Sequence, residues 1–135
     1  MNVDYYSNLK KYFNGEGKSL IRKDSSDTLR EHLRHYEIMM GDLLIQKNII
    51  KVLDLGCGDG KILYEFSKLY PEKSFVGIDL SDKNISIANQ KYKSKNINYL
   101  AGNILDFDLK LIGTFDIVYS FSFIQYFEAK DMKCL

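Results

Sequence analysis

The sequence predicts an α/β fold in which parallel strands alternate with helices. Short apolar runs alternate with segments of helical periodicity over residues 49–120, a pattern typical of strand–helix–strand units with right-handed crossovers. The first apolar run ends in three glycines at alternate positions, and a helical pattern follows at once, all within residues 51–70. No repeat or linker divides the 135 residues, so a single domain is expected.

The composition limits the classes of function. Hydrophobic residues make up 45% of the chain, enough for a core, and 19 basic and 18 acidic residues leave a net charge of +1. Such a balance does not favour a nucleic-acid or membrane-surface partner, and no apolar run approaches the roughly 18 residues of a membrane helix. The two cysteines fit no zinc or redox spacing, so we expect no metal site and a reduced, cytoplasmic setting.

Residues 1–48 are expected to form an N-terminal helical segment. Its first part, residues 1–24, mixes tyrosines with lysines and two glycines, which fits either aromatic packing on the core or a lid over a ligand site. Residues 25–47 predict one long helix whose apolar stripe contains Leu29, Leu33, Tyr36, Met40 and Leu43. The basic residues of this helix are expected to form a solvated face, with His32 or His35 as a substrate-side base being the alternative.

The later elements follow from apolar runs and the residues that break them. Continuous apolar character predicts a strand buried on both faces over residues 49–55. The helix after the glycines ends at Pro71 and should face the sheet with Ile62, Leu63, Phe66, Leu69 and Tyr70. Ser81 is expected to cap a helix over residues 82–93, and the aromatic residues 121–127 to turn helical. Further strands are predicted over residues 74–78, 97–101 and 115–120.

The turn after the first strand carries the chemistry, in the stretch K-V-L-D-L-G-C-G-D-G-K. In an open parallel sheet, ligands bind outside the carboxyl ends of the strands, and glycine lets the backbone approach them closely. Gly56 and Gly58 match two positions of the dinucleotide fingerprint, but Lys61 stands at the third. Asp54 and Asp59 would repel a pyrophosphate, whereas they suit a cationic ligand with a ribose, such as S-adenosylmethionine.

These motifs resemble those of class I S-adenosylmethionine-dependent methyltransferases. V-L-D-L-G-C-G-D-G is similar to the first motif of that family, V-G-I-D-L-S (76–81) to the second and F-D-I-V-Y-S (115–120) to the motif of the fourth strand. The resemblance runs from about Ile49 to Phe127. It implies a Rossmann-like core over residues 49–135 with strand order 3-2-1-4, which lacks the last three strands of the family's seven-stranded sheet.

The resemblance also implies roles for the matching residues. Asp54 would orient the turn near the methionine amino group, and Asp79 would accept hydrogen bonds from both ribose hydroxyls. From the residues alone, Asp54 could instead cap turn amides, Asp79 could merely flank a helix, and Asn103 could be a turn residue. The other implied contacts are Gly56, Cys57, Gly58 and Gly60 along the methionine and ribose, Leu80, Asn103 and Ile104 around the adenine, and Ser120 beside the methyl group.

Methyl transfer to a small molecule is the activity that the resemblance implies. No residue is singled out as catalytic, because displacement at a sulfonium depends mainly on positioning. The segment after the fourth strand lacks the proline motif of amino-group methylases, which favours an oxygen or carbon acceptor. A catalytically silent S-adenosylmethionine-binding or dimerisation module and an NAD-dependent oxidoreductase stay open. The apolar edge at residues 115–120 should be covered by a second copy or another partner, and the short polar tail indicates a truncated chain.

Overall fold

The computed structural model describes residues 38–121 without a gap, together with residues 7, 10, 11, 14, 35, 36, 126, 127 and 130. These residues form a four-stranded, fully parallel sheet in the order β3-β2-β1-β4. The strands are β1 (Lys51–Leu55), β2 (Ser74–Asp79), β3 (Ile97–Ala101) and β4 (Ile117–Tyr119). The predicted fold class and strand order are therefore confirmed.

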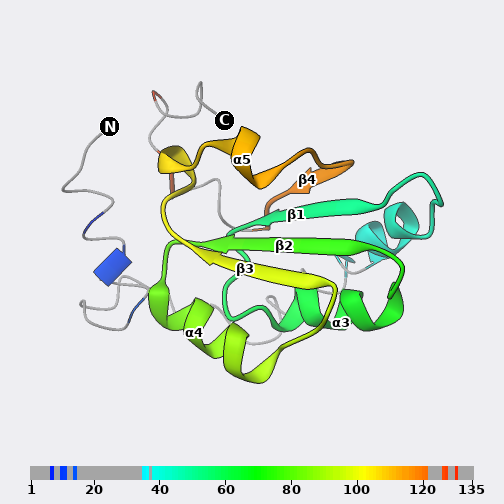
Figure 1. Cartoon of the computed structure of the whole chain (residues 1–135), viewed down its shortest axis with the longest axis horizontal. Coiled ribbons are helices and arrows are strands. Elements are labelled where there is room, and N and C mark those ends of the chain that lie inside the picture. The colour runs from blue at the N-terminus through cyan, green and yellow to red at the C-terminus, as the bar shows by residue number, and fades with distance from the viewer. Residues whose placement is uncertain are drawn as a thin grey trace.

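Helices cover the two faces of the sheet unequally (Figure 1). Helices α3 (Lys61–Leu69) and α4 (Asp82–Lys91) pack on one face, and the helical residues 38–44 add to the same core. In the described part of the chain, the other face carries the 3-10 helix η1 (Ile104–Asp106) and the four-residue helix α5 (Leu109–Ile112). None of the described helices has the length and apolar character that a membrane span requires.

Strand β1 is buried on both faces, as its continuous apolar run predicts. Successive side chains of a strand point to opposite faces. Val52 accordingly packs in the core under the helices, whereas Leu53 packs on the other face with Ile78 and Ile104. The ladder begins at Lys51, two residues later than predicted.

The predicted buried face of the N-terminal helix is wrong at its last residue. Tyr36 and Met40 are buried as expected, but Leu43 is 37% exposed and Leu44 is fully buried. The inward residues therefore follow a spacing of four along the helix. Helical periodicity allows either three or four residues between inward positions, so the sequence did not decide between two adjacent leucines.

Helices α3 and α4 start where predicted, and the differences are one residue of the predicted face of α3 and the end of α4. Leu69 is 69% exposed and does not face the sheet, whereas Leu63 and Phe66 are buried. Ser81 caps α4 as predicted, because its hydroxyl accepts a hydrogen bond from the Asn84 amide, and α4 ends at Lys91. The predictions for residues 25–34 and 122–125, His32 included, lie outside the described residues.

Candidate cofactor site

The glycine turn lies where β1 and β2 end. These strands are parallel neighbours, so their carboxyl ends meet at one edge of the sheet. The amides of Gly56 and Cys57 both donate to the Ile78 carbonyl, at 2.7 and 3.1 Å. The turn is thereby tied to β2, and it brings its backbone next to Asp54 and Asp79.

Two glycines of this turn are required for different reasons. Both have left-handed backbones, with φ of 58° at Gly58 and 79° at Gly60. A Cβ at Gly58 would meet no described atom within 4 Å, whereas a Cβ at Gly60 would lie 2.6 Å from the Tyr99 ring. The Tyr99 hydroxyl lies 3.2 Å from the Gly60 carbonyl and 3.1 Å from the Tyr92 carbonyl. Gly58 thus faces open space, whereas Gly60 packs against the Tyr99 ring.

Asp79 connects the turn to the start of α4. One carboxylate oxygen accepts from the Gly58 amide at 2.9 Å, and the other from the Ser81 amide at 2.9 Å and the Asn84 side chain at 3.4 Å. The carboxyl is only 9% exposed. Burial raises its pKa above the ordinary value, and these three hydrogen bonds oppose the rise. Asp79 therefore does more than flank a helix.

Asp54 is the most perturbed carboxyl of the site. It is 5% exposed, and burial raises its pKa from 3.8 to about 7; the Tyr119 hydroxyl lowers the pKa and the charge of Asp79 raises it further. No described turn amide donates to its carboxyl, which argues against a capping role. Within the described chain, neither Asp54 nor Asp79 forms an ion pair with a lysine or arginine.

Strand β4 adds polar groups at the same edge. Tyr119 pairs with Asp54 in register, and Ser120 follows it at the end of the strand. The Tyr119 and Ser120 hydroxyls are buried without a hydrogen bond of standard geometry to the described residues. The Tyr119 hydroxyl interacts with Asp54 and Tyr36 at less favourable geometry. Buried polar groups are normally satisfied, so a polar ligand fits here. Sequence reasoning proposed Ser120 and missed Tyr119, although it precedes Ser120 in the same motif.

The residues proposed for the adenine side lie around the end of β3. The Gly102 amide donates to the Asp79 carbonyl at 2.9 Å. The Asn103 side-chain oxygen accepts from the Leu105 amide at 3.1 Å and so begins η1, which makes Asn103 a turn residue whatever else it binds. Leu80 and Ile104 are 8% and 3% exposed, so both side chains belong to the core near the site.

Cys57 is a packing residue of the turn. A Cβ added to Gly77 on β2 would lie 2.8 Å from its sulfur, so thiol and strand are in close contact. Burial, reinforced by the charges of Asp54 and Asp79, raises the pKa of the thiol well above its ordinary value. A thiol that stays protonated is a poor nucleophile, which excludes Cys57 as a reactive group at neutral pH.

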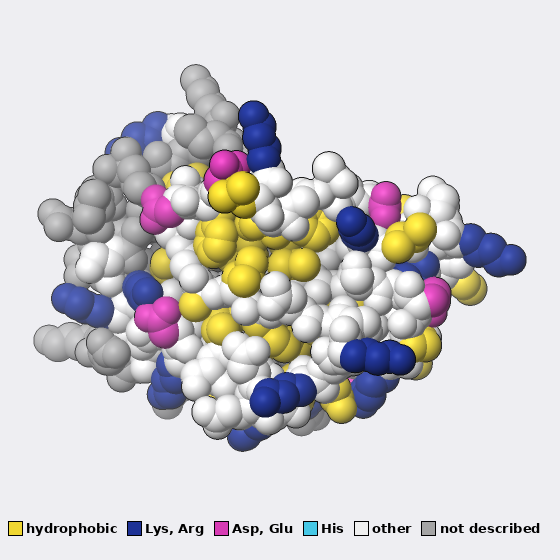
Figure 2. Space-filling view, in the orientation of Figure 1, with side chains coloured by type: hydrophobic (Ala, Val, Ile, Leu, Met, Phe, Trp, Pro, Cys, Tyr) yellow, Lys and Arg dark blue, Asp and Glu magenta, His cyan; other side chains and the backbone are white. Residues whose placement is uncertain are grey.

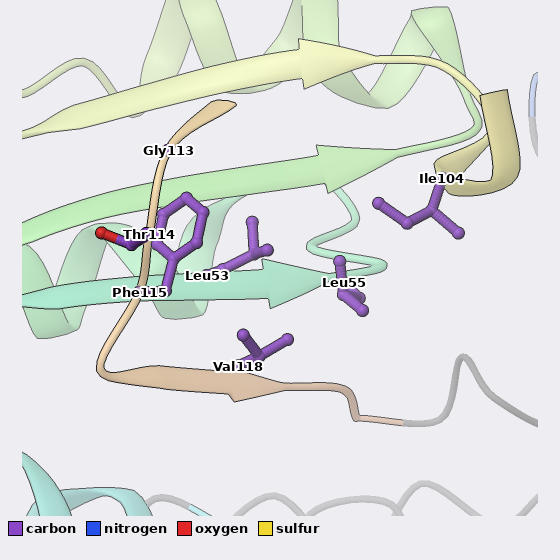
Figure 3. Close-up of a pocket in the computed structure, with 7 residues that line it drawn as sticks. All are labelled: Leu53, Leu55, Ile104, Gly113, Thr114, Phe115 and Val118. Carbon is purple, nitrogen blue, oxygen red and sulfur yellow. The ribbon is translucent and has the colours of Figure 1, made fainter. Parts of the chain in front are cut away.

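The thinly covered face of the sheet carries an apolar trough. Figure 2 shows hydrophobic side chains gathered near the middle of this face, over the sheet. The trough has a volume of about 390 Å³, and Figure 3 shows that its lining residues come from β1, β4, the segment before β4 and η1. The lining residues are Leu53, Leu55, Ile104, Gly113, Thr114, Phe115 and Val118.

Comparisons with known proteins agree on one family. Residues 52–135 match the family described as a methyltransferase domain. The chain is 26% identical over 119 residues to the malonyl-[acyl-carrier protein] O-methyltransferase of Bacillus cereus, a match that spans 87% of this chain and 42% of that enzyme. The chain spans less than half the length of the curated relatives that it matches.

Two solved structures have similar folds. Magnesium protoporphyrin IX methyltransferase (ChlM) from Synechocystis PCC 6803, with bound SAM, matches with a TM-score of 0.74 at 16% identity, over 98% of this chain and 68% of that chain. PKMT2 from Rickettsia typhi, in complex with AdoHcy, matches with a TM-score of 0.56 at 30% identity, over 64% of this chain and 17% of that chain.

Proposed function

This chain belongs to the methyltransferase domain family, and we propose that it binds S-adenosylmethionine at the carboxyl ends of β1 and β2 for transfer of the methyl group to a small-molecule acceptor. The observation that carries the proposal is the buried pair Asp54 and Asp79, beside which the described chain places no ion-paired lysine or arginine. Two such carboxyls repel a pyrophosphate and attract a cation. S-adenosylmethionine offers an ammonium, a sulfonium and two ribose hydroxyls.

Asp79 is the proposed ribose ligand. An ionised carboxylate has about four acceptor positions, and the Gly58 amide, the Ser81 amide and the Asn84 side chain take three of them. The Asn84 contact is long, at 3.4 Å, and is the one that a ribose hydroxyl would replace most easily. The two hydroxyls then take the free position and the one that Asn84 gives up.

The methionine end is proposed to lie between Asp54 and the end of β4. Asp54 would bind the ammonium group, and the buried hydroxyls of Tyr119 and Ser120 would gain a polar partner. The backbone of Gly56 and Gly58 would border the cofactor, because open space lies beside Gly58. Cys57 would contribute packing and no chemistry.

The adenine end is proposed to lie beside Leu80 and Asn103. The Asn103 side-chain oxygen accepts one hydrogen bond from the Leu105 amide. A carbonyl oxygen has two lone pairs, so Asn103 can also accept from the adenine amino group. Leu80 and Ile104 would supply apolar surface at the edge of the ring rather than an exposed wall, because both are already buried.

The bound cofactor would supply a methyl group on an excellent leaving group. The residues of this chain would then act by holding that methyl group in place, since positioning alone can supply much of the rate. The Bacillus cereus relative is an O-methyltransferase by name, which supports oxygen as the acceptor atom here. The sparse cysteines support a cytoplasmic setting.

The apolar trough and the outer edge of β4 are proposed to be covered by polypeptide. The curated relatives are more than twice as long as the matched part, and we propose that the corresponding polypeptide packs here. Val118 of the trough is 56% exposed, and an uncovered apolar strand edge promotes association. In its absence, the 135-residue chain should bind a hydrophobic dye, and Val118→Lys should reduce that binding.

Calorimetry with the 135-residue chain tests the cofactor proposal. We expect S-adenosylmethionine and S-adenosylhomocysteine to bind more tightly than about 100 µM, roughly −5.5 kcal/mol, and NAD not to bind. Asp79→Ala should abolish the signal. Asp108→Asn is the matched control, because Asp108 is an exposed acid outside the proposed site whose carboxylate accepts from the Lys110 amide. Binding of NAD alone, or unchanged binding by Asp79→Ala, would contradict the proposal.

A further inference from the structure

A turn near the N-terminus lies against the cofactor side of the sheet. The Asn14 amide donates to the Lys10 carbonyl at 3.0 Å, which closes one helical turn. Figure 1 shows this part of the chain beyond the carboxyl ends of β2 and β3, next to the first residues of α4. Two side chains of the turn, Lys10 and Asn14, reach that helix.

Asn14 completes the cap of α4 from a distant part of the sequence. Its side-chain oxygen accepts from the Ser81 hydroxyl at 2.6 Å and from the Lys83 amide at 3.3 Å. Because both partners are donors toward one atom, the oxygen of the amide must face them. The Ser81 hydroxyl accepts from the Asn84 amide at 3.1 Å and donates to Asn14.

Water cannot replace Asn14 easily at this position. Ser81 is fully buried, with 0% exposure, and breaking a hydrogen bond of a buried hydroxyl is costly. The second contact of the turn is different in kind. Lys10 pairs with Asp82 at 2.8 Å, but their side chains are 37% and 60% exposed, and exposed ion pairs contribute little. Of these two described contacts, the one made by Asn14 contributes more to holding the turn on α4.

Hydrogen bonds connect Asn14 to the site through two residues. Asn14 binds the Ser81 side chain, the Ser81 amide donates to Asp79 at 2.9 Å, and Asp79 accepts from the Gly58 amide at 2.9 Å. The same carboxyl is the proposed ribose ligand. Any shift of Ser81 moves a donor that fixes the orientation of Asp79, and hence the acceptor positions that remain for the cofactor.

We propose that Asn14 is a positioning residue for cofactor binding: it holds Ser81, and through Ser81 the Asp79 carboxyl, in the orientation that accepts the ribose hydroxyls. The inference rests on the proposed function. Coupling between two bound elements is reciprocal, so the cofactor in turn holds the N-terminal turn on α4. The turn is then a part of the cofactor site rather than a neighbour of it.

Matched variants test this inference by calorimetry with S-adenosylhomocysteine. Asn14→Ala should weaken binding about 5- to 10-fold, the size expected for one lost buried hydrogen-bond acceptor. Asn14→Asp should bind within about twofold of the parent chain, because a carboxylate oxygen can accept from both donors. Lys11→Ala is the control, since Lys11 is an exposed residue of the same turn.

Hydrogen exchange supplies a readout that a purely structural role would not change. In the parent chain, S-adenosylhomocysteine should slow exchange at the Lys83 amide; in Asn14→Ala this ligand effect should be lost while the melting temperature stays within a few degrees. If the parent binds and Asn14→Ala binds equally well, the inference is overturned and the proposed function stands. If the parent chain does not bind the ligand, both the proposed function and this inference are contradicted. Should Asn14→Ala not fold, absence of ligand-induced protection at Lys83 in the parent, or weak binding by Asn14→Asp, overturns the inference.

Discussion

The two ends of the sheet differ in how fully the protein satisfies their charged side chains. At the amino end, one carboxylate oxygen of Asp116 accepts from the Ile50 and Lys51 amides, both at 2.8 Å. These bonds lower the pKa of Asp116 below its ordinary value. Lys73 is only 4% exposed there, and its ammonium donates to two backbone carbonyls, at 2.6 and 3.0 Å. Each charge at this end is matched by groups of the protein itself.

At the carboxyl end, the protein satisfies its buried polar and charged groups only in part. Asp54 and Asp79 are buried with raised pKa values, and the Tyr119 and Ser120 hydroxyls lack standard hydrogen bonds to the described residues. Such groups lower stability unless a ligand satisfies them. The contrast separates charges that stabilise the fold from charges that we propose serve binding. It predicts that substitutions at the two ends shift stability and affinity independently.

The largest effect is expected within the glycine turn. Gly60→Ala would place a methyl group 2.6 Å from the Tyr99 ring on a left-handed backbone, and should lower the free energy of unfolding by about 3 kcal/mol. Gly58→Ala is the matched variant, because its Cβ meets open space. It should cost only about 1 kcal/mol yet abolish binding of S-adenosylhomocysteine. Urea denaturation and calorimetry measure the two quantities; equal losses of stability would remove the distinction between the two glycines.

Replacing the carboxyl of Asp54 should separate affinity from stability. Asp54→Asn keeps the shape of the side chain and removes the charge that is proposed to bind the ammonium group. We expect about 30-fold weaker binding, or about 2 kcal/mol. The free energy of unfolding at pH 7 should be unchanged or higher, because the buried carboxyl disfavours the folded state as it ionises. A variant that loses stability without losing affinity would instead make Asp54 a structural residue.

The pH dependence of binding follows from the raised pKa of Asp54, about 7 against an ordinary 3.8. As the pH rises from about 4 to 7, the unfolded chain ionises at this residue before the folded chain does, so Asp54 lowers the stability of the free protein. In the proposed site, the cationic cofactor binds the protein with Asp54 ionised. Affinity should therefore rise roughly twentyfold from pH 5.5 to 7.5.

Calorimetry across this pH range measures the affinity. The groups that face Asp54 also affect the result, because they shift its pKa. The Asp79 carboxyl raises the pKa of Asp54 and the Tyr119 hydroxyl lowers it. Asp54→Asn should flatten the profile, and Tyr119→Phe should move it to higher pH. A profile that is equally steep in Asp54→Asn would assign the pH dependence to Asp79 or to the ligand.

The elements of the fold could be predicted because their signals are local. Ser81 caps a helix whose Asn84 amide is three residues away, and the glycine turn, the strand and the helix lie within a few residues. The site was partly predictable for the same reason. Asp54 lies next to the end of the first apolar run and Asp79 ends the second, and parallel neighbours bring such ends together.

The contacts that support the site could not be predicted, because they join distant segments. Tyr99 contacts Gly60 although 39 positions of the sequence separate them, and Asn14 binds Ser81 at a separation of 67 positions. No local pattern marks either pair. Asp116 is a different case. It lies inside the predicted strand 115–120, whereas β4 begins only at Ile117. Asp116 therefore precedes the strand and lies at the amino end of the sheet, away from the proposed cofactor site.

Asp116 gives the smallest effect and the sharpest control. Asp116→Ala leaves the Ile50 and Lys51 amides without their acceptor at an exposed position, where water can replace it, so the melting temperature should fall by only a few degrees. Because the pKa of Asp116 is lowered, its stabilisation is present above about pH 4 and is lost as the pH falls further. The variant should therefore differ least from the parent in acid.

Affinity of Asp116→Ala for S-adenosylhomocysteine should stay within twofold of the parent. A larger loss would mean that the two ends of the sheet are coupled, and that charges satisfied by the protein also serve binding.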